Sequence, residues 1–246
     1  MKFKDRVAVI TGAGRGIGAA TAQVFAEDGA NLVLADMDLE PVAGIADVLG
    51  KAVAVTCDVT SREQVEAMVA RAMSEFGRVD VLVCCAGIIR DNLLFKMTDE
   101  DWDLVIDTHL KGAFLCARAA QKPMVDQKYG KMVFLSSTSA LGNRGQTNYS
   151  TAKAGLQGMA RTLAIELGPF NINVNVVAPG FVETRMTRAT AERMGIDFES
   201  FKIGAASQIP LRRVGQPEDI ARVIAFLCSD DSSFISGQTI YVRGGP

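Results

Sequence analysis

The sequence lacks the features that would place it at a membrane or on nucleic acid. No apolar run approaches the roughly 18 residues that a membrane-spanning helix needs, and the start, MKFKDRVAVITGAG, contains no apolar leader with a cleavage site. Basic residues are not in excess, since 26 Lys and Arg stand against 28 Asp and Glu. We therefore expect no membrane segment, no electrostatic binding of nucleic acid and a cytoplasmic location.

Metal ligands are also scarce. The chain has one histidine, His109, and five cysteines whose positions (57, 84, 85, 116 and 228) match no metal-binding spacing. The odd number of cysteines in a chain without a leader predicts buried, reduced thiols and no disulfide framework. We expect no metal site, so any chemistry must come from other groups.

What the sequence does contain is a regular alternation of short apolar runs and helix-like segments. The runs are rich in Val, Ile and Leu without clean alternation, as in parallel strands buried on both faces. No repeat or linker interrupts the pattern, which predicts one α/β domain over 1–246 with a doubly wound, Rossmann-type, seven-stranded parallel sheet and helices on both faces. The expected strands are 6–11, 31–36, 51–57, 79–85, 130–136, 172–178 and 238–244.

One long segment, 184–216, breaks this regularity. It carries charged residues beside Met186, Met194, Phe198 and Phe201, and it lies between two core elements. A long irregular insertion in a compact domain is often functional, so we expect it to be a substrate lid.

A glycine-rich loop follows the first expected strand. In VAVITGAGRGIG, the glycines Gly12, Gly16 and Gly18 have the spacing G-x-x-x-G-x-G, directly before a helix. Such glycines allow a tight turn and a close approach of the backbone to a pyrophosphate, and the helix N-terminus favours the phosphate charge. The strand-loop-helix context predicts a dinucleotide site.

Residues that follow the next two strands bear on the identity of the dinucleotide. Asp36 is placed to accept hydrogen bonds from an adenosine ribose and to repel a 2′-phosphate, which favours NAD(H). Arg15 favours NADP(H), although Met37 supplies no second cation. Asp58 and Val59 are expected beside the adenine. The alternative for both aspartates is a helix N-cap.

The stretch NYSTAKAG places Tyr149 four residues before Lys153, on one face of an expected helix. A cation beside a phenol favours the phenolate and would lower its pKa towards a useful range for proton transfer. The alternative is an ordinary pair on a surface helix.

Taken together, the motifs resemble the short-chain dehydrogenase/reductase family over essentially the whole chain. The glycine loop, the AG of CCAG, a serine after the fifth strand, Tyr149-x-x-x-Lys153 and APG at 178–180 occur in the family's order. The segment from 142 to 184 looks most like the branch of 3-oxoacyl-[acyl-carrier-protein] reductases. The resemblance implies hydride transfer between a nicotinamide cofactor and a ketone or secondary alcohol.

The resemblance also implies residue roles. Tyr149 would exchange the proton on the substrate oxygen, Lys153 would bind the nicotinamide ribose and lower the tyrosine pKa, and Ser137 would hold the substrate oxygen. Counting from Gly130 along the strand selects Ser137, whereas counting back from Tyr149 selects Ser136. We prefer the strand register. Gly87 would close the cofactor cleft, and Val182 and Thr184 would contact the nicotinamide carboxamide. The full set of implied cofactor contacts is Gly12, Arg15, Gly16, Ile17, Gly18, Asp36, Asp58, Val59, Ala86, Gly87, Tyr149, Lys153, Pro179, Gly180, Val182 and Thr184.

The chain departs from the family pattern at two places. Cys84 and Cys85 replace paired asparagines that commonly brace the sheet. His109 replaces an asparagine that is assigned to holding a water in the proton path. We hypothesise that a ring nitrogen of His109 takes over this contact; a structural histidine is the alternative.

We expect an NAD(H)-linked enzyme, with NADP(H) possible, that acts on a 3-oxoacyl or 3-hydroxyacyl thioester of CoA or acyl-carrier protein. The alternatives are dehydrogenation of a small cyclic alcohol, sugar alcohol or steroid-like substrate, and a catalytically silent NAD(H)-binding scaffold. The resemblance implies a homotetramer built through helices near 98–122 and 147–168 and the last strand. Four cations of the expected lid could bind a pantetheine-linked phosphate: Arg185, Arg188, Arg193 and Lys202. The alternative is that they form the solvent-exposed face of a helix.

Overall fold

The computed structural model describes residues 1–246 and confirms the expected α/β architecture. Its single seven-stranded sheet has the order β3-β2-β1-β4-β5-β6-β7, and every neighbouring pair is parallel. The order reverses between β1 and β4, and ligands of open parallel sheets bind in the crevice at such a point. The strands are β1 (Val7–Thr11), β2 (Asn31–Asp36), β3 (Ala52–Thr56), β4 (Val81–Cys84), β5 (Gly130–Leu135), β6 (Ile172–Pro179) and β7 (Thr239–Val242).

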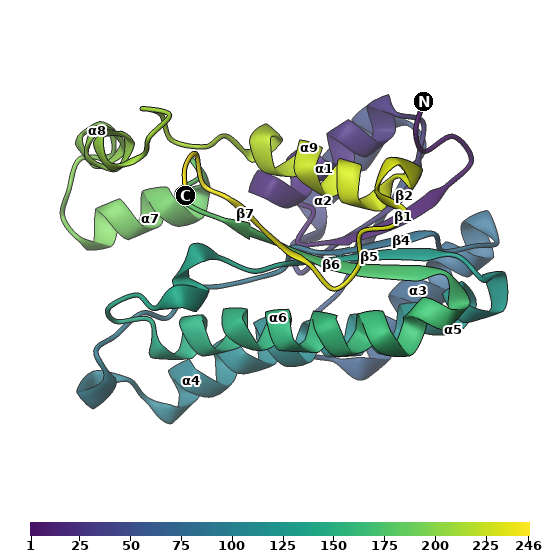
Figure 1. The fold of residues 1–246 in the computed structure, drawn as a ribbon, viewed down its shortest axis with the longest axis horizontal. Coiled ribbons are helices and arrows are strands. Elements are labelled where there is room, and N and C mark those ends of the chain that lie inside the picture. The colour runs from purple at the N-terminus through teal and green to yellow at the C-terminus, as the bar shows by residue number, and fades with distance from the viewer.

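Helices cover both faces of the sheet (Figure 1). One face carries α1 (Gly16–Glu27), α2 (Leu39–Leu49) and α9 (Pro217–Cys228). The other carries α3 (Arg62–Phe76), α4 (Asp99–Ile106), α5 (Gly112–Gln127) and α6 (Thr147–Leu167). Short 3-10 turns are η1 (Leu94–Lys96), η3 (Thr138–Leu141), η4 (Gly168–Phe170) and η5 (Asp230–Ser232). No helix is both long and apolar enough to span a bilayer.

The core consists of two apolar layers, one on each face of the sheet. Val7 and Val9 of β1 belong to a cluster of 27 buried residues, whereas Ala8 and Ile10 belong to one of 21. Successive side chains of a strand point to opposite faces, so a strand buried on both sides must be apolar throughout. This explains why the runs of the sequence show no alternation.

The region near 98–122 is not one regular helix. Thr98 caps α4 by accepting a hydrogen bond from the Asp101 N–H at 3.1 Å. A π-helical turn, η2 (Asp107–Lys111), then separates α4 from α5 and contains His109. Single π-turns inside α-helices are frequent at functional sites.

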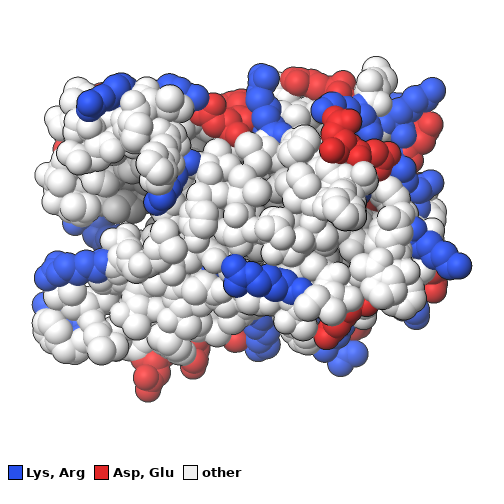
Figure 2. Space-filling view, in the orientation of Figure 1, with Lys and Arg blue, Asp and Glu red and all other residues white.

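The irregular segment 184–216 folds into two helices, α7 (Arg185–Arg193) and α8 (Phe198–Gln208), beyond the carboxyl ends of the strands (Figure 1). A bridge between Val182 and Gly215 joins the residues just before the segment to its end. The space-filling view is hollowed between these helices and the body of the molecule, and Lys and Arg side chains lie along the edges of the hollow (Figure 2).

Candidate active site

The glycine loop is packed too tightly for side chains. A Cβ at Gly12, whose φ is +65°, would lie 2.6 Å from the Ala86 nitrogen, and a Cβ at Gly18 would collide with the Gly12 carbonyl oxygen. The loop after β1 therefore lies directly against the loop after β4. Glycine is required at these two positions by the close approach and not by turn propensity alone.

The start of α1 presents unpaired donors. The first hydrogen bond at this end runs from the Ala19 N–H to the Arg15 carbonyl, which leaves the amides of Gly16, Ile17 and Gly18 without an acceptor. Free amides at a helix N-terminus form an anion site, so the loop fits the pyrophosphate of a dinucleotide. Thr184 lies across this site, because a Cβ at Gly16 would lie 3.6 Å from its methyl group.

Asp36 is fixed by the glycine loop. Its carboxylate accepts hydrogen bonds from the Gly14 N–H at 2.9 Å and from the Asp38 N–H at 3.3 Å. The N-cap alternative for Asp36 is wrong, because α2 begins after Asp38. Arg15 forms an ion pair with Asp38 at 2.6 Å, so its charge already has a partner.

Asp58 is not a helix cap either. The cap of α3 is Ser61, while Asp58 accepts from the N–H and hydroxyl of Thr60 at 2.9 and 2.8 Å. Such a turn fixes the backbone that leads from β3 past Val59. Val59 is buried and lines the cavity described below.

The structure brings Tyr149 and Lys153 together on the buried face of α6. The Lys153 ammonium lies 5.3 Å from the centre of the Tyr149 ring and donates to the Leu135 carbonyl at 2.5 Å. Leu135 ends β5, so the lysine is held at the carboxyl edge of the sheet. Both side chains are less than a tenth exposed, so an ordinary surface-helix pair is excluded.

The two serines after β5 have different surroundings. The Ser136 hydroxyl is buried and donates to the Lys153 carbonyl at 2.7 Å. The Ser137 hydroxyl accepts a hydrogen bond from the Ser139 N–H at 3.1 Å and is near enough to Tyr149 to oppose the rise in the tyrosine pKa. The strand register therefore puts Ser137, not Ser136, beside the phenol.

Burial controls the two pKa values. It raises the pKa of Tyr149 to about 12, with the charge of Asp91 adding to the rise, and it lowers the pKa of Lys153 to about 7. Both buried groups favour their neutral forms because charge is costly away from water. The expectation that Lys153 lowers the pKa of Tyr149 does not hold for the protein without a bound cofactor.

His109 lies between the phenol and the loop after β4. Its Nε2 is 2.7 Å from the Ile88 carbonyl oxygen and 3.1 Å from the Ile88 nitrogen, and its Nδ1 is buried without a partner. Burial, followed by the nearby Lys153 charge, holds the pKa of His109 well below its ordinary value, so the ring is neutral. The shorter contact favours a proton on Nε2, which leaves Nδ1 as an acceptor.

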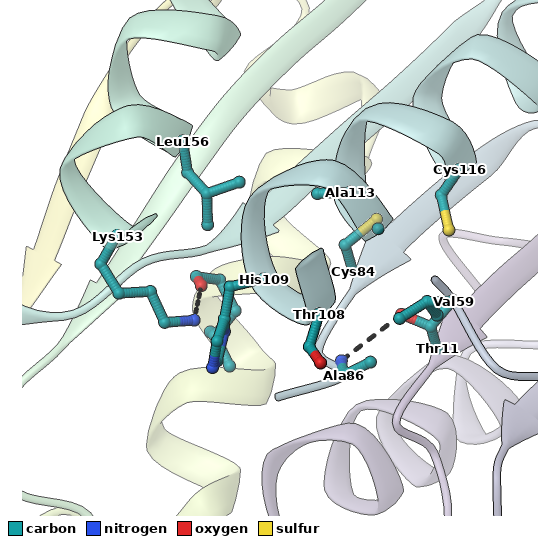
Figure 3. Close-up of a pocket in the computed structure, with 12 residues that line it drawn as sticks. Thr11, Val59, Cys84, Ala86, Thr108, His109, Ala113, Cys116, Lys153 and Leu156 are labelled. Carbon is teal, nitrogen blue, oxygen red and sulfur yellow. Dashed lines mark hydrogen bonds between the residues drawn. The ribbon is translucent and has the colours of Figure 1, made fainter. Parts of the chain in front are cut away.

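A small cavity lies next to these groups (Figure 3). Its volume of about 10 Å³ is close to the ~10–15 Å³ that one water needs. His109 and Lys153 line one side, and Thr11, Cys84 and Cys116 line the other (Figure 3). The cavity is thus large enough for a single small molecule and not for a substrate.

Comparison with known proteins identifies the group to which this site belongs. The profile of a family described as enoyl-(acyl carrier protein) reductase matches residues 12–246. The chain belongs to the short-chain dehydrogenase/reductase family of oxidoreductases. It is 45% identical to the short-chain reductase NovJ of Streptomyces niveus over 98% of this chain and 94% of NovJ.

Two further relatives of this dehydrogenase/reductase cover nearly its whole length. The 3-oxoacyl-[acyl-carrier-protein] reductase FabG of Thermotoga maritima is 43% identical over 100% of this chain and 99% of its own. A Brucella melitensis structure described as a short-chain dehydrogenase/reductase, glucose/ribitol dehydrogenase, superposes with a TM-score of 0.92 at 37% identity, covering 99% and 97% of the two chains.

Most cations of the segment 184–216 in this dehydrogenase/reductase already have acidic partners. Lys202 lies 3.1 Å from Glu183, Arg188 lies 3.5 Å from the same carboxylate, and Arg193 lies 2.8 Å from Asp91. The aromatic residues contribute to packing, since Phe198 is buried and Phe201 meets Phe181 edge-on with ring centres 5.2 Å apart. Arg185 forms no ion pair and remains a candidate for a phosphate contact.

The five cysteines are free, as expected for a reduced protein, and Cys85 alone is partly exposed. Burial raises the pKa of Cys85 and of Cys57 to about 12, so neither is a thiolate at neutral pH. These thiols act as small apolar side chains.

Sequence reasoning missed three residues that hold the site together, namely Asn148, Gln146 and Asp91. Asn148 is fully buried; its amide donates to the carbonyls of Arg90 and Asp101, and its oxygen accepts from the Tyr149 N–H at 2.7 Å. Gln146 donates to Asp91 at 2.9 Å. Only the position of Asn148 beside Tyr149 could have indicated its role, because the other contacts span about fifty residues.

Proposed function

We propose that this dehydrogenase/reductase interconverts a 3-oxoacyl and a 3-hydroxyacyl thioester with NAD(H) as the preferred cofactor. The observation that carries this proposal is the convergence of Ser137, Tyr149 and Lys153 beside a glycine loop with free amides. The 3-oxoacyl-[acyl-carrier-protein] reductase of Thermotoga maritima aligns over nearly its whole length, which supports an acyl thioester as the substrate.

A bound nicotinamide dinucleotide would supply or accept the hydride. Tyr149 would give its proton to the substrate oxygen during reduction, and its raised pKa ensures that the phenol carries that proton at neutral pH. Ser137 would orient the substrate oxygen and stabilise its developing charge. Lys153, held by the Leu135 carbonyl, would contact the nicotinamide ribose and favour the phenolate when it is charged.

The preference for NAD(H) rests on two carboxylates. Asp36 places negative charge where a ribose 2′-phosphate would approach. Asp38 forms an ion pair with the guanidinium of Arg15, so this cation is already neutralised. The pyrophosphate would lie on the amides of Gly16, Ile17 and Gly18. The remaining expected contacts would close around the nicotinamide and adenine: Gly12, Asp58, Val59, Ala86, Gly87, Pro179, Gly180, Val182 and Thr184.

His109 would take part in proton transfer through its free Nδ1. The ring lines a cavity that also reaches Lys153, and the cavity has the volume for one water. A neutral imidazole with Nε2 bound to the Ile88 carbonyl would offer Nδ1 as an acceptor in a path from Lys153 to solvent.

The segment 184–216 would close over an acyl chain, with Arg185 at the phosphate of a CoA or acyl-carrier-protein arm. The protein would act in the cytoplasm as a homotetramer. Support for an assembly comes from exposed apolar side chains, including Ile165 on α6, 78% exposed, and Phe114 on α5, 46% exposed. The face over α6 and β7 carries few charged side chains (Figure 2).

One observation favours a second candidate function. The Brucella melitensis structure is described as a glucose/ribitol dehydrogenase, which supports oxidation of a sugar alcohol or another small polyol. A cyclic or steroid-like alcohol belongs to the same reaction class. A silent NAD(H)-binding scaffold would need no proton donor, and the buried pair Tyr149 and Lys153, with Ser137 beside the phenol, argues against it.

A substrate panel with a Tyr149→Phe control tests the proposal. We expect oxidation of NADH with acetoacetyl-CoA to exceed that with simple cyclic ketones, and NAD⁺ reduction with ribitol to be negligible. Y149F should bind NADH as the wild type does and lose turnover. Turnover retained in Y149F would refute the assignment, whereas tight NADH binding without turnover on any substrate would favour the scaffold.

A further inference from the structure

The lid is connected to the catalytic helix through one carboxylate, Asp91. This residue lies in the loop after β4, and its side chain is 15% exposed. Its Oδ2 atom accepts hydrogen bonds from Arg193 at 2.8 Å and from Gln146 at 2.9 Å. Arg193 ends the lid helix α7, and Gln146 immediately precedes α6, three residues before Tyr149.

The loop that carries Asp91 is fixed to the start of α6 on both sides. The Asn92 N–H donates to the Gly145 carbonyl at 2.9 Å, and the Asn148 amide donates to the Arg90 carbonyl at 2.9 Å. Asp91 therefore cannot move independently of the helix that positions the phenol. The contact with Arg193 is the only ion pair between α7 and this loop.

The other carboxylate oxygen of Asp91 shows that the contact with Arg193 has a cost. Oδ1 of Asp91 is buried and has no hydrogen-bond partner. An unpaired buried acceptor opposes the attraction of the ion pair, and opening of α7 would expose this oxygen to water. The two opposing effects make the contact suited to reversible closure.

We propose that Asp91 and Arg193 are positioning residues that form the latch of the lid and set α7 against the helix carrying Tyr149. This role depends on the proposed function, because a lid matters only if substrate binds beneath it. The latch itself is a property of the protein alone and can be measured without turnover. The charge of Asp91 also acts on Tyr149, which shows how near the latch lies to the phenol.

Hydrogen exchange of α7 in the cofactor-free protein tests the latch directly. We expect D91A and R193A to speed exchange of the α7 amides about tenfold, and R193K to retain protection because it keeps the charge. Glu192→Ala is the matched control, since this neighbouring residue is exposed and forms no ion pair. Unchanged exchange in both D91A and R193A would overturn the proposal.

Kinetics with acetoacetyl-CoA and a double-mutant cycle separate a latch from a general structural defect. D91A and R193A should each raise KM about tenfold while changing kcat less than about threefold, and the double variant should be no worse than either single one. Additive effects, or loss of kcat alone, would contradict the latch. If the wild type shows no turnover, the proposed function fails while the exchange result still decides the latch.

Discussion

The His109 imidazole meets the Tyr149 phenol edge-on, with ring centres 5.1 Å apart and planes at 87°. Both rings are buried, and the histidine is presented by a π-turn between α4 and α5. The one histidine of the chain is therefore in contact with the candidate proton donor and next to the cavity that reaches Lys153. This arrangement makes the role of His109 open to direct tests.

We expect His109→Asn to keep most of the turnover, because an amide can supply a polar contact at this position. His109→Leu should lower kcat by about 100-fold, the lower end of what a positioned proton-transfer group contributes. The measurement is kcat across a pH series for both variants, with NADH binding as the control for folding. Full turnover in the leucine variant would assign His109 a structural role.

Gly87 controls the position of His109. A Cβ at this glycine would collide with the Cε1 atom of the ring, so Gly87→Ala should displace the imidazole and lower turnover. Gly44→Ala is the matched control, because a Cβ there meets nothing within 4 Å and the residue lies in α2. G44A should keep full activity and gain about 0.5–1 kcal/mol of unfolding free energy. Equal activity of G87A and wild type would show that His109 tolerates displacement.

The buried Lys153 should make stability depend on pH. Its pKa falls from 10.5 to about 7 on folding, so the unfolded state binds more protons between these values and unfolding free energy rises with pH there. Lys153→Met should remove this contribution. We expect the variant to be more stable than the wild type by on the order of 4 kcal/mol at pH 7, with the difference shrinking towards pH 10.5.

Urea denaturation of the cofactor-free proteins at several pH values would measure this effect. A difference that stays constant with pH would mean that Lys153 is not desolvated in solution. A variant less stable than the wild type at neutral pH would mean that the hydrogen bond to Leu135 outweighs the cost of burial.

Asp36 offers a test of cofactor choice in which charge and loop geometry are separated. Asp36→Asn keeps an acceptor for the Gly14 N–H but removes the charge, whereas Asp36→Ala removes both. We expect D36N to shift the ratio of kcat/KM for NADH over NADPH towards NADPH by about tenfold, and D36A to weaken both cofactors as well. A wild type that prefers NADPH would show that the charge of Asp36 does not select the cofactor.

The sequence by itself determined the elements and their order. Apolar runs without alternation identified all seven strands within two residues at each end, because a strand buried on both faces has to be apolar. The glycine loop and the Tyr149-Lys153 pair were likewise evident, since their spacing fixes their geometry within one turn or one helix.

Only the tertiary structure decided how the site is surrounded. It gave Ser136 and Ser137 their different surroundings, where the sequence had only favoured Ser137 by strand register, and it connected Asp91 with Arg193 across 102 positions. Without a cofactor, the pKa of Tyr149 is raised where a lowered value was expected, because burial outweighs the hydrogen bond of Ser137. Such properties depend on what packs around a group, and distant segments of the chain supply those neighbours.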